Sequence, residues 1–255
     1  MNASPEDNRT SRYGSKNAYS DPSVYATYDQ KRFTSYGGKL FDRREKAILL
    51  AGAPADAESR ILECGAGTGR FAAEMARRGY RVLATDVSPG MLDQTRKRVE
   101  MEGLSDRVSV EYGDIYNLKF PDGTFDFVYS LRVLNQLADN QDKRRAITEL
   151  ARVVRPGGWL LFDVVNLHSL AILKNASWHI SPRAVRRILE DAGCRIERLQ
   201  GAMLLTQTLI EVVPRPLAWL ANMVDRGACR LLPFLATRVY FLARKLPPTE
   251  QAGDT

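Results

Sequence analysis

The segment ILECGAGTGRF, residues 61–71, places Gly65, Gly67 and Gly69 between an apolar run and a run with a helical pattern. Glycine reaches backbone conformations that other residues avoid, so three glycines can simply form a tight turn. They can also let a ligand approach the backbone, where the first N–H groups of a helix are free to bind it. The segment alone leaves both interpretations open, and the rest of the chain decides between them.

Composition and charge bound the class of protein. The 255 residues are 44% hydrophobic and 26% charged, which is typical of a soluble globular protein with one large domain or two small ones. Lys and Arg number 37 and Asp and Glu 30, giving a net charge of +7. The basic residues are dispersed, which favours a solvated basic surface over an acidic partner.

Cysteine usage and the absence of sorting signals indicate a cytoplasmic location. The three cysteines lack metal-ligand spacing, so we expect no metal site, and their odd number argues against a disulfide framework. The polar N-terminus is not a secretory signal, and no apolar run is long enough to cross a bilayer. A reducing, intracellular compartment fits these features best.

The chain divides into a main domain and flanking segments. We expect disordered tails at 1–20 and 247–255, because both are polar. Residues 21–53 are predicted to form an N-terminal cap and a helix near 40–51. Residues 54–246 are predicted to form the main domain.

Strand and helix patterns alternate along the main domain. Predicted strands at 61–64, 80–86, 108–114, 125–131 and 159–165 alternate with helical segments, of which 139–154 is expected to stop at Pro156-Gly157-Gly158. Ser88-Pro89 and Ser181-Pro182 are N-terminal signals for two of the helices. Two more strands are predicted at 194–204 and 236–245. Such alternation is typical of a doubly wound α/β fold with a mostly parallel sheet.

Acidic residues follow the first three predicted strands on one edge of the sheet. Asp86 ends the second strand 21 residues after Gly65, where a carboxylate can accept both hydroxyls of a ribose, and Asp114 ends the third. The spacing G-A-G-T-G differs from the G-x-G-x-x-G of nicotinamide dinucleotide sites. Glu63 would repel a pyrophosphate but attract an ammonium group. The pattern therefore predicts a ribonucleoside that carries an amino acid.

At this point the sequence resembles the class I S-adenosylmethionine-dependent methyltransferases. The resemblance covers about residues 60–200 and is carried by LECGAGTGR, ATDVSPGML, YGDIYNLKFPDGTFDFVYS and LARVVRPGGWLLFDV. It implies a Rossmann-like seven-stranded sheet with the last strand antiparallel, so that 236–245 would lie beside the fifth strand. The main domain would then be a methyltransferase domain with S-adenosyl-L-methionine as its cofactor.

The resemblance also assigns roles within the cofactor site. Glu63, Gly65 and Gly67 would meet the methionine end, Asp86 the ribose hydroxyls, and Ser130 the region of the sulfonium. Asp114 and Ile115 would flank adenine. The remaining cofactor-binding residues expected from the same motifs are Gly69, Val87 and Met91. Cys64, next to the loop, is interpreted as a small buried side chain and not as a reactive thiol.

Residues for the methyl acceptor are harder to assign. His168 follows the fifth strand and His179 precedes a helix, so each is a candidate general base; a histidine in either position is more often a surface or capping residue. Arg132 and Asn135 follow the fourth strand and are candidates for substrate binding, although polar residues also occur there routinely.

Residues 205–235 form an apolar, basic insert before the last strand. Leu217, Leu220, Val224 and Leu231 share one face of a predicted helix. This helix could pack on the sheet or on a partner subunit. It could also cover a lipid-like substrate as a lid, or rest peripherally on the inner membrane as a basic amphipathic surface.

The sequence therefore predicts an enzyme that methylates an oxygen or nitrogen of a small molecule, which could be lipid-like or sugar-containing. A nucleic-acid methyltransferase is less favoured, because the chain has no separate basic or aromatic module and no motif for a flipped base. The motifs are also compatible with a non-catalytic S-adenosylmethionine-binding scaffold and, less well, with an NAD-dependent oxidoreductase. Neither the acceptor nor the oligomeric state follows from the sequence.

Overall fold

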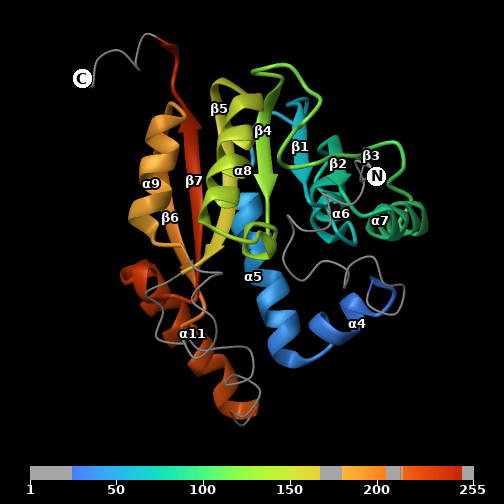
Figure 1. The fold of residues 1–255 in the computed structure, drawn as a ribbon. Coiled ribbons are helices and arrows are strands. Elements are labelled where there is room, and N and C mark those ends of the chain that lie inside the picture. Colours follow the sequence, from blue (N-terminus) through green and yellow to red (C-terminus); the bar gives the residue numbers. More distant parts are fainter. Residues whose placement is uncertain (1–24, 167–179, 205–212, 214, 249–255) are drawn as a thin grey trace, which may run out of the picture.

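A seven-stranded sheet forms the centre of the protein (Figure 1). The computed structural model describes residues 25–166, 180–204, 213 and 215–248. Within these, the strand order is β3-β2-β1-β4-β5-β7-β6, and β7 runs antiparallel to both of its neighbours, β5 and β6. The predicted fold class and the place of the last strand are confirmed. The strands are β1 Ile61–Cys64, β2 Val82–Asp86, β3 Val108–Tyr112, β4 Phe125–Ser130, β5 Val154–Val165, β6 Cys194–Ala202 and β7 Arg238–Lys245.

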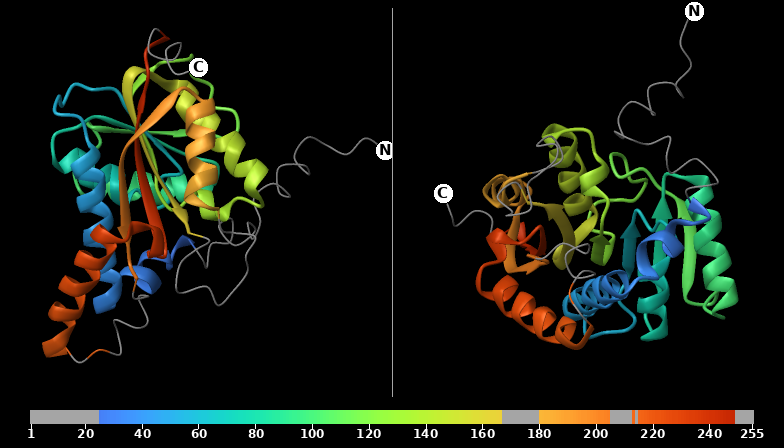
Figure 2. Two further views of the ribbon diagram at one scale, coloured as in Figure 1. Left: turned by 90° about the vertical axis from the view of Figure 1, so that its left-hand side faces the viewer. Right: turned by 90° about the horizontal axis from the view of Figure 1, so that it is seen from below.

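Helices cover both faces of the sheet (Figures 1 and 2). Apolar side chains of α5, α6 and α7 pack on one face, and those of α8 and α9 pack on the other. Burying both faces explains why the central strands are apolar at nearly every position. The helices are α4 Tyr28–Phe33, α5 Tyr36–Gly52, α6 Arg70–Arg77, α7 Pro89–Met101, α8 Asn140–Val153, α9 Pro182–Asp191 and α11 Arg215–Leu231, with short 3₁₀ turns η1 Leu134–Gln136 and η3 Pro233–Leu235.

Local signals set several helix starts. The Ser88 hydroxyl accepts a hydrogen bond from the Met91 N–H, and Ser181 caps α9 in the same way, with a proline next in each helix. Both predicted caps are confirmed. The helix expected near 40–51 begins earlier, at Tyr36, because the Ser35 hydroxyl accepts a hydrogen bond from the Gly38 N–H at 3.1 Å.

One predicted boundary is wrong. Pro156-Gly157-Gly158 does not separate a helix from a strand, because α8 already ends at Val153 and these residues lie inside β5. The pairing of β4 with β5 shifts register between Phe125 and Phe127, so the strand accommodates Pro156 and the positive φ of Gly157 at an irregularity. The predicted tail 1–20 lies outside the described residues, as does 249–255.

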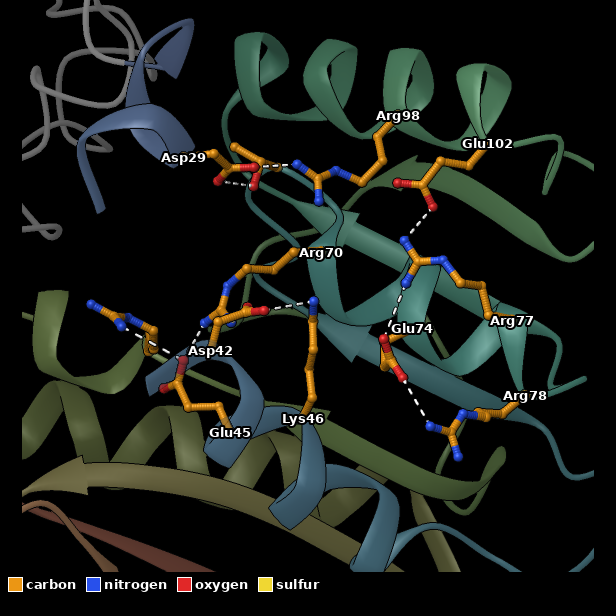
Figure 3. Close-up of polar contacts among 12 residues, drawn as sticks. Asp29, Asp42, Glu45, Lys46, Arg70, Glu74, Arg77, Arg78, Arg98 and Glu102 are labelled. Atoms are coloured by element: carbon orange, nitrogen blue, oxygen red, sulfur yellow. Dashed lines mark hydrogen bonds and ion pairs between the residues drawn. The ribbon is translucent and has the colours of Figure 1, made fainter. Parts of the chain in front are cut away.

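A buried carboxylate ties α5 to the rest of the domain (Figure 3). Glu45 is fully buried and accepts hydrogen bonds from the Arg70 guanidinium and from the Tyr240 hydroxyl, the latter at 2.9 Å. Arg70 also donates to Asp42 at 2.6 Å, and Arg132 lies 3.6 Å from Glu45. Burial alone would raise the pKa of Glu45, but the arginine charges outweigh it and hold the pKa below its ordinary value. Glu45 is therefore ionised and satisfied.

We predict that Glu45→Ala lowers the free energy of unfolding by about 3–5 kcal/mol, because it leaves Arg70 buried with fewer partners. Urea denaturation at neutral pH measures the change. Asp93→Ala is the control: its ion pair with Arg96 is exposed and should contribute no more than about 1 kcal/mol. Equal losses in the two variants would show that the Glu45 cluster does not hold the domain together.

Candidate cofactor and acceptor site

The glycine loop joins β1 to α6 at the carboxyl edge of the sheet. Gly65, Gly67 and Gly69 have φ angles of +81°, +58° and +74°, a region that residues with a side chain rarely adopt. The N–H groups of Gly65 and Ala66 both donate to the Thr85 carbonyl at the end of β2, at 2.7 and 2.9 Å. The loop is thus held against the neighbouring strand by its own backbone.

The three glycines face different surroundings. A Cβ atom on Gly65 would overlap the Val133 side chain, and one on Gly69 would lie 2.8 Å from Thr95 Cγ2. A Cβ on Gly67 would meet no atom within 4 Å. Gly65 and Gly69 are therefore needed for packing as well as for φ, whereas Gly67 borders open space that a ligand can fill.

Asp86 organises the same loop from the end of β2. One carboxylate oxygen accepts from the Gly67 N–H at 2.8 Å and the other from the Ser88 N–H at 2.9 Å. Burial raises the pKa of Asp86, and hydrogen bonds from the backbone oppose this rise. Two candidate cofactor residues follow Asp86 in the sequence. Val87 is partly buried, and Met91 is buried.

Glu63 lies under the loop in the middle of β1. Its side chain is almost completely buried and accepts a hydrogen bond from the Tyr129 hydroxyl at 3.1 Å. Burial raises the pKa of Glu63 to about 8, against the opposing effects of Tyr129 and Arg70. A ligand cation beside Glu63 would favour its ionised form.

The polar groups at the ends of β3 and β4 already form hydrogen bonds within the protein. Asp114 follows β3 and accepts a hydrogen bond from the Tyr116 N–H at 2.9 Å, and Ile115 is buried. The Ser130 hydroxyl, at the end of β4, is buried and donates to the Cys64 carbonyl at 2.8 Å. Cys64 itself is buried, and burial raises the pKa of its thiol, as expected for an unreactive side chain.

Arg132 occupies an unusual position just after β4. Its φ of +65° is rare for a residue with a side chain, and its N–H donates to Asp163 of β5 at 2.5 Å. The guanidinium lies over the rings of Phe33 and Phe41, 5.7 and 5.0 Å from their centroids. No described residue accepts a hydrogen bond from this guanidinium, although Glu45 lies close enough for an ion pair. Within the described part of the chain, donors of the Arg132 guanidinium thus form no hydrogen bond.

The remaining acceptor-site candidates divide into two groups. Asn135 lies in η1, and its Oδ1 is buried with no hydrogen-bond partner among the described residues. Such an orphaned acceptor is uncommon in native structures and is consistent with a donor supplied by a ligand. His168 and His179 lie outside the described residues.

The N-terminal cap predicted at 21–53 contacts the glycine loop through Asp29, a contact that the sequence did not specify. Asp29 of α4 accepts hydrogen bonds from the Thr68 hydroxyl at 2.8 Å and from Arg98 of α7 (Figure 3). The ring of Tyr25 lies against Gly90 so closely that a Cβ there would overlap it. The cap therefore covers the loop and the start of α7.

The geometry defines a class of protein. A loop with open backbone space at Gly67 lies between buried carboxylates at the ends of β1 and β2, on a sheet with an antiparallel β7 between β5 and β6. Ligands of open α/β sheets bind at this edge. The carboxylates suit hydroxyl and ammonium groups better than phosphates, as in a nucleoside linked to an amino acid.

Comparisons with known proteins identify the family. A family model described as "Methyltransferase domain" matches residues 62–162. The demethylmenaquinone methyltransferase of Thermus thermophilus is 33% identical over 199 residues, which are 77% of this chain and 84% of that protein. The chain therefore belongs to the class I S-adenosylmethionine-dependent methyltransferases.

Other relatives share only part of their length. The malonyl-[acyl-carrier protein] O-methyltransferase of Serratia marcescens is 37% identical over 46% of this chain and 42% of that protein. The chain spans about half the length, or less, of several curated relatives that it matches. Among solved structures, the CcbJ methyltransferase of Streptomyces caelestis superposes with a TM-score of 0.66 at 16% identity, covering 90% of this chain and 98% of that one. This likeness shows the shared fold.

We predict that Asp86→Ala weakens the binding of S-adenosylhomocysteine by about a hundredfold to ten-thousandfold. Two charge-assisted hydrogen bonds to the ribose would be lost, each contributing about 1.5–3 kcal/mol. Calorimetric titration measures the affinity, and circular dichroism checks the fold. Asp93→Ala, an exposed acid on α7, should leave the affinity unchanged. An unaltered affinity in Asp86→Ala would remove the residue from the ribose site.

We predict that S-adenosylhomocysteine binds more tightly as the pH rises from 6 towards the Glu63 pKa of about 8. Below that pKa the free protein holds a proton on Glu63, which must leave when the carboxylate meets the ligand ammonium. Binding heats in buffers of different ionisation enthalpy should reveal the released proton.

Glu63→Gln is the matched variant, and its affinity should be weaker and nearly independent of pH in this range. The same sign applies to stability. The folded pKa exceeds the unfolded value of 4.5, so the free wild type should lose stability between about pH 4.5 and pH 8, and Glu63→Gln should lose less. A pH profile of binding that is identical in the two proteins would contradict the role of Glu63.

Proposed function

We propose that the chain transfers the methyl group of S-adenosyl-L-methionine to an oxygen or nitrogen of a small molecule. The open space at Gly67, bordered by the Asp86 carboxylate, is the observation that carries the proposal. Glu63 and Gly65 would also hold the methionine end, and Asp86 the ribose. The adenine and sulfonium regions would be formed by Asp114, Ile115 and Ser130, with Gly69, Val87 and Met91 completing the cofactor site.

In the proposed reaction the bond from sulfur to methyl breaks while a bond from the acceptor atom to methyl forms. S-adenosylhomocysteine leaves, and the acceptor loses one proton. Such a displacement depends mainly on orientation and on exclusion of water. The cap favours both, because Asp29 and Tyr25 hold it against the glycine loop and α7.

The acceptor class is proposed from Arg132. Names of relatives include acceptors as different as malonyl-[acyl-carrier protein] and demethylmenaquinone, so they do not single out a substrate. The Arg132 guanidinium, held over two aromatic rings, suits an acidic oxygen on an otherwise apolar or aromatic molecule. Asn135 Oδ1 would accept a hydrogen bond from the same acceptor. A lipid-like or sugar-containing acceptor is compatible with these contacts.

A general base is proposed for a hydroxyl acceptor, with His168 as the candidate and His179 as the second. Both rest on their place in the sequence, after β5 and before α9. An imidazole can take a hydroxyl proton near neutral pH. A cytoplasmic location is likewise a proposal, based on composition.

The test is methyl transfer from methyl-labelled S-adenosylmethionine to a panel of phenols, carboxylic acids, alcohols and amines. We expect transfer by the wild type and a loss of at least about a hundredfold in turnover for His168→Ala, with intact S-adenosylhomocysteine binding. His179→Ala is the comparison. If neither histidine change lowers turnover beyond about tenfold, no histidine acts as the base. Transfer to no member of the panel, with cofactor binding intact, would favour the non-catalytic scaffold.

Arg132→Met separates acceptor binding from cofactor binding in the same assay. It should raise the KM for an acidic acceptor by about tenfold to a hundredfold, as expected for lost hydrogen bonds to a charged group. The affinity for S-adenosylhomocysteine should not change. A change in both would assign Arg132 to the integrity of the Glu45 cluster instead.

A further inference from the structure

Exposed apolar side chains are concentrated on one helix. Of the ten large apolar side chains that are exposed among the described residues, seven lie between residues 217 and 232. On α11 itself, Leu220, Met223, Val224 and Leu231 are exposed by 44% to 81%, and Trp219 lies beside them. A concentration of exposed apolar side chains of this kind indicates an interaction site. We call these five side chains the outer face of α11.

The opposite face of α11 carries the polar contacts. Asp225 is buried and forms an ion pair with Arg44 of α5, which also donates to Asn222. Asp225 accepts a further hydrogen bond from the Leu204 N–H at 2.9 Å. An ordinary surface helix turns its apolar face inward. This helix is reversed, with its polar groups satisfied inside and its apolar groups outside.

Close packing fixes this orientation. Gly201 of β6 lies so near to α11 that an added Cβ would be 2.9 Å from the Cys229 carbonyl oxygen, and Cys229 is buried. Rotating α11 to hide its outer face would break the contacts of Asp225 and bury bulkier side chains against Gly201. The packing of α11 therefore keeps the outer face exposed to solvent.

The charges on α11 indicate what covers the outer face. Asp225 is the only acidic residue of the helix, and it is buried and paired with a cation. Arg226 and Arg230 are exposed and flank the apolar side chains. A symmetric pairing of two copies along this helix would bring these arginines together without an acid on α11 to offset them. A surface that offers an apolar interior to the exposed apolar side chains and negative charge to the arginines would match both features of α11.

We propose that α11 docks the protein on a bilayer that contains anionic lipids. Leu220, Val224 and Leu231 would enter the boundary between headgroups and acyl chains, with Trp219 at the interface and the arginines among the phosphates. Among the described residues no helix is long and apolar enough to cross a membrane.

Docking would also orient the proposed site. The chain runs from α11 through η3 into β7, whose first residue, Arg238, pairs with Val165 at the carboxyl end of β5. In Figure 1, α11 and the cap helix α4 both lie at the end of the sheet towards which β4 points. If the proposed function holds, a lipid-soluble acceptor could pass from the bilayer to the site. Docking itself does not depend on that function.

Sedimentation of the full chain with vesicles tests the proposal. We expect binding to vesicles of equal parts phosphatidylcholine and phosphatidylglycerol, much weaker binding to phosphatidylcholine alone, and weakening by salt. The Trp219 side chain should also report insertion, through a blue shift of emission that Trp219→Phe removes. Failure of the wild type to bind the anionic vesicles would overturn the proposal.

Two variants locate the contact. Leu220→Glu with Val224→Glu should weaken vesicle binding by at least about tenfold, because it places two charges at the acyl boundary. Met101→Glu, an exposed apolar position on α7, is the control and should bind as the wild type does. Unchanged S-adenosylhomocysteine binding and unfolding midpoint would show that the double variant is folded. Normal vesicle binding by the folded double variant would refute the proposal.

Arg226→Glu with Arg230→Glu should selectively reduce binding to the anionic vesicles. Sedimentation equilibrium without lipid tests whether a second copy covers the outer face instead. A wild-type dimer that the Leu220→Glu, Val224→Glu variant converts into a monomer would assign the outer face to a second copy and overturn bilayer docking. Methyl transfer is not measured in these experiments, so a failed acceptor screen leaves their outcome intact.

Discussion

The constraint on which the rest of the structure depends is the burial of the Glu45 carboxylate. An isolated ionised carboxylate in the interior is strongly unfavourable, so every partner must be in place when the domain folds. Those partners come from α6, from β7 and from the segment after β4, as Arg70, Tyr240 and Arg132. One side chain thereby joins the start of the glycine-loop helix, the last strand and the proposed acceptor site.

Helix α5, which carries Glu45, also holds α11 through a second ion pair. Arg44 precedes Glu45 on α5 and forms the ion pair with Asp225 that holds α11. Two consecutive residues of opposite charge thus connect α5 to the site on one side and to the outer helix on the other. A rigid α5 would couple the orientation of α11 to the position of Arg132.

Features that depend on neighbouring residues could be predicted from the sequence, and features that depend on distant ones could not. The glycine loop, Asp86 and the serine caps are local patterns, and the fold class follows from the alternation of strand and helix patterns. Asp29 and Thr68 are 39 residues apart, and Glu45 and Tyr240 are 195 apart, so no spacing rule links them. The positive φ of Arg132 could not be predicted from the sequence either, because the Asp163 carboxylate that accepts a hydrogen bond from its N–H lies on another strand, β5. The prediction that Pro156-Gly157-Gly158 ends a helix was wrong, because these residues lie inside β5, which pairs with β4 in the sheet.

The two buried glutamates, Glu45 and Glu63, show why the proposed site suits a cation. Both side chains are removed from water, yet the pKa of Glu45 is lowered and that of Glu63 is raised to about 8. The difference lies in their partners, since Glu45 has arginines in contact, whereas the Tyr129 hydroxyl that donates to Glu63 is neutral. Among the described residues, no cation forms an ion pair with Glu63, so it lacks the positive charge that a buried carboxylate requires. In the proposed complex, the ammonium of S-adenosylmethionine would supply to Glu63 what Arg70 supplies to Glu45.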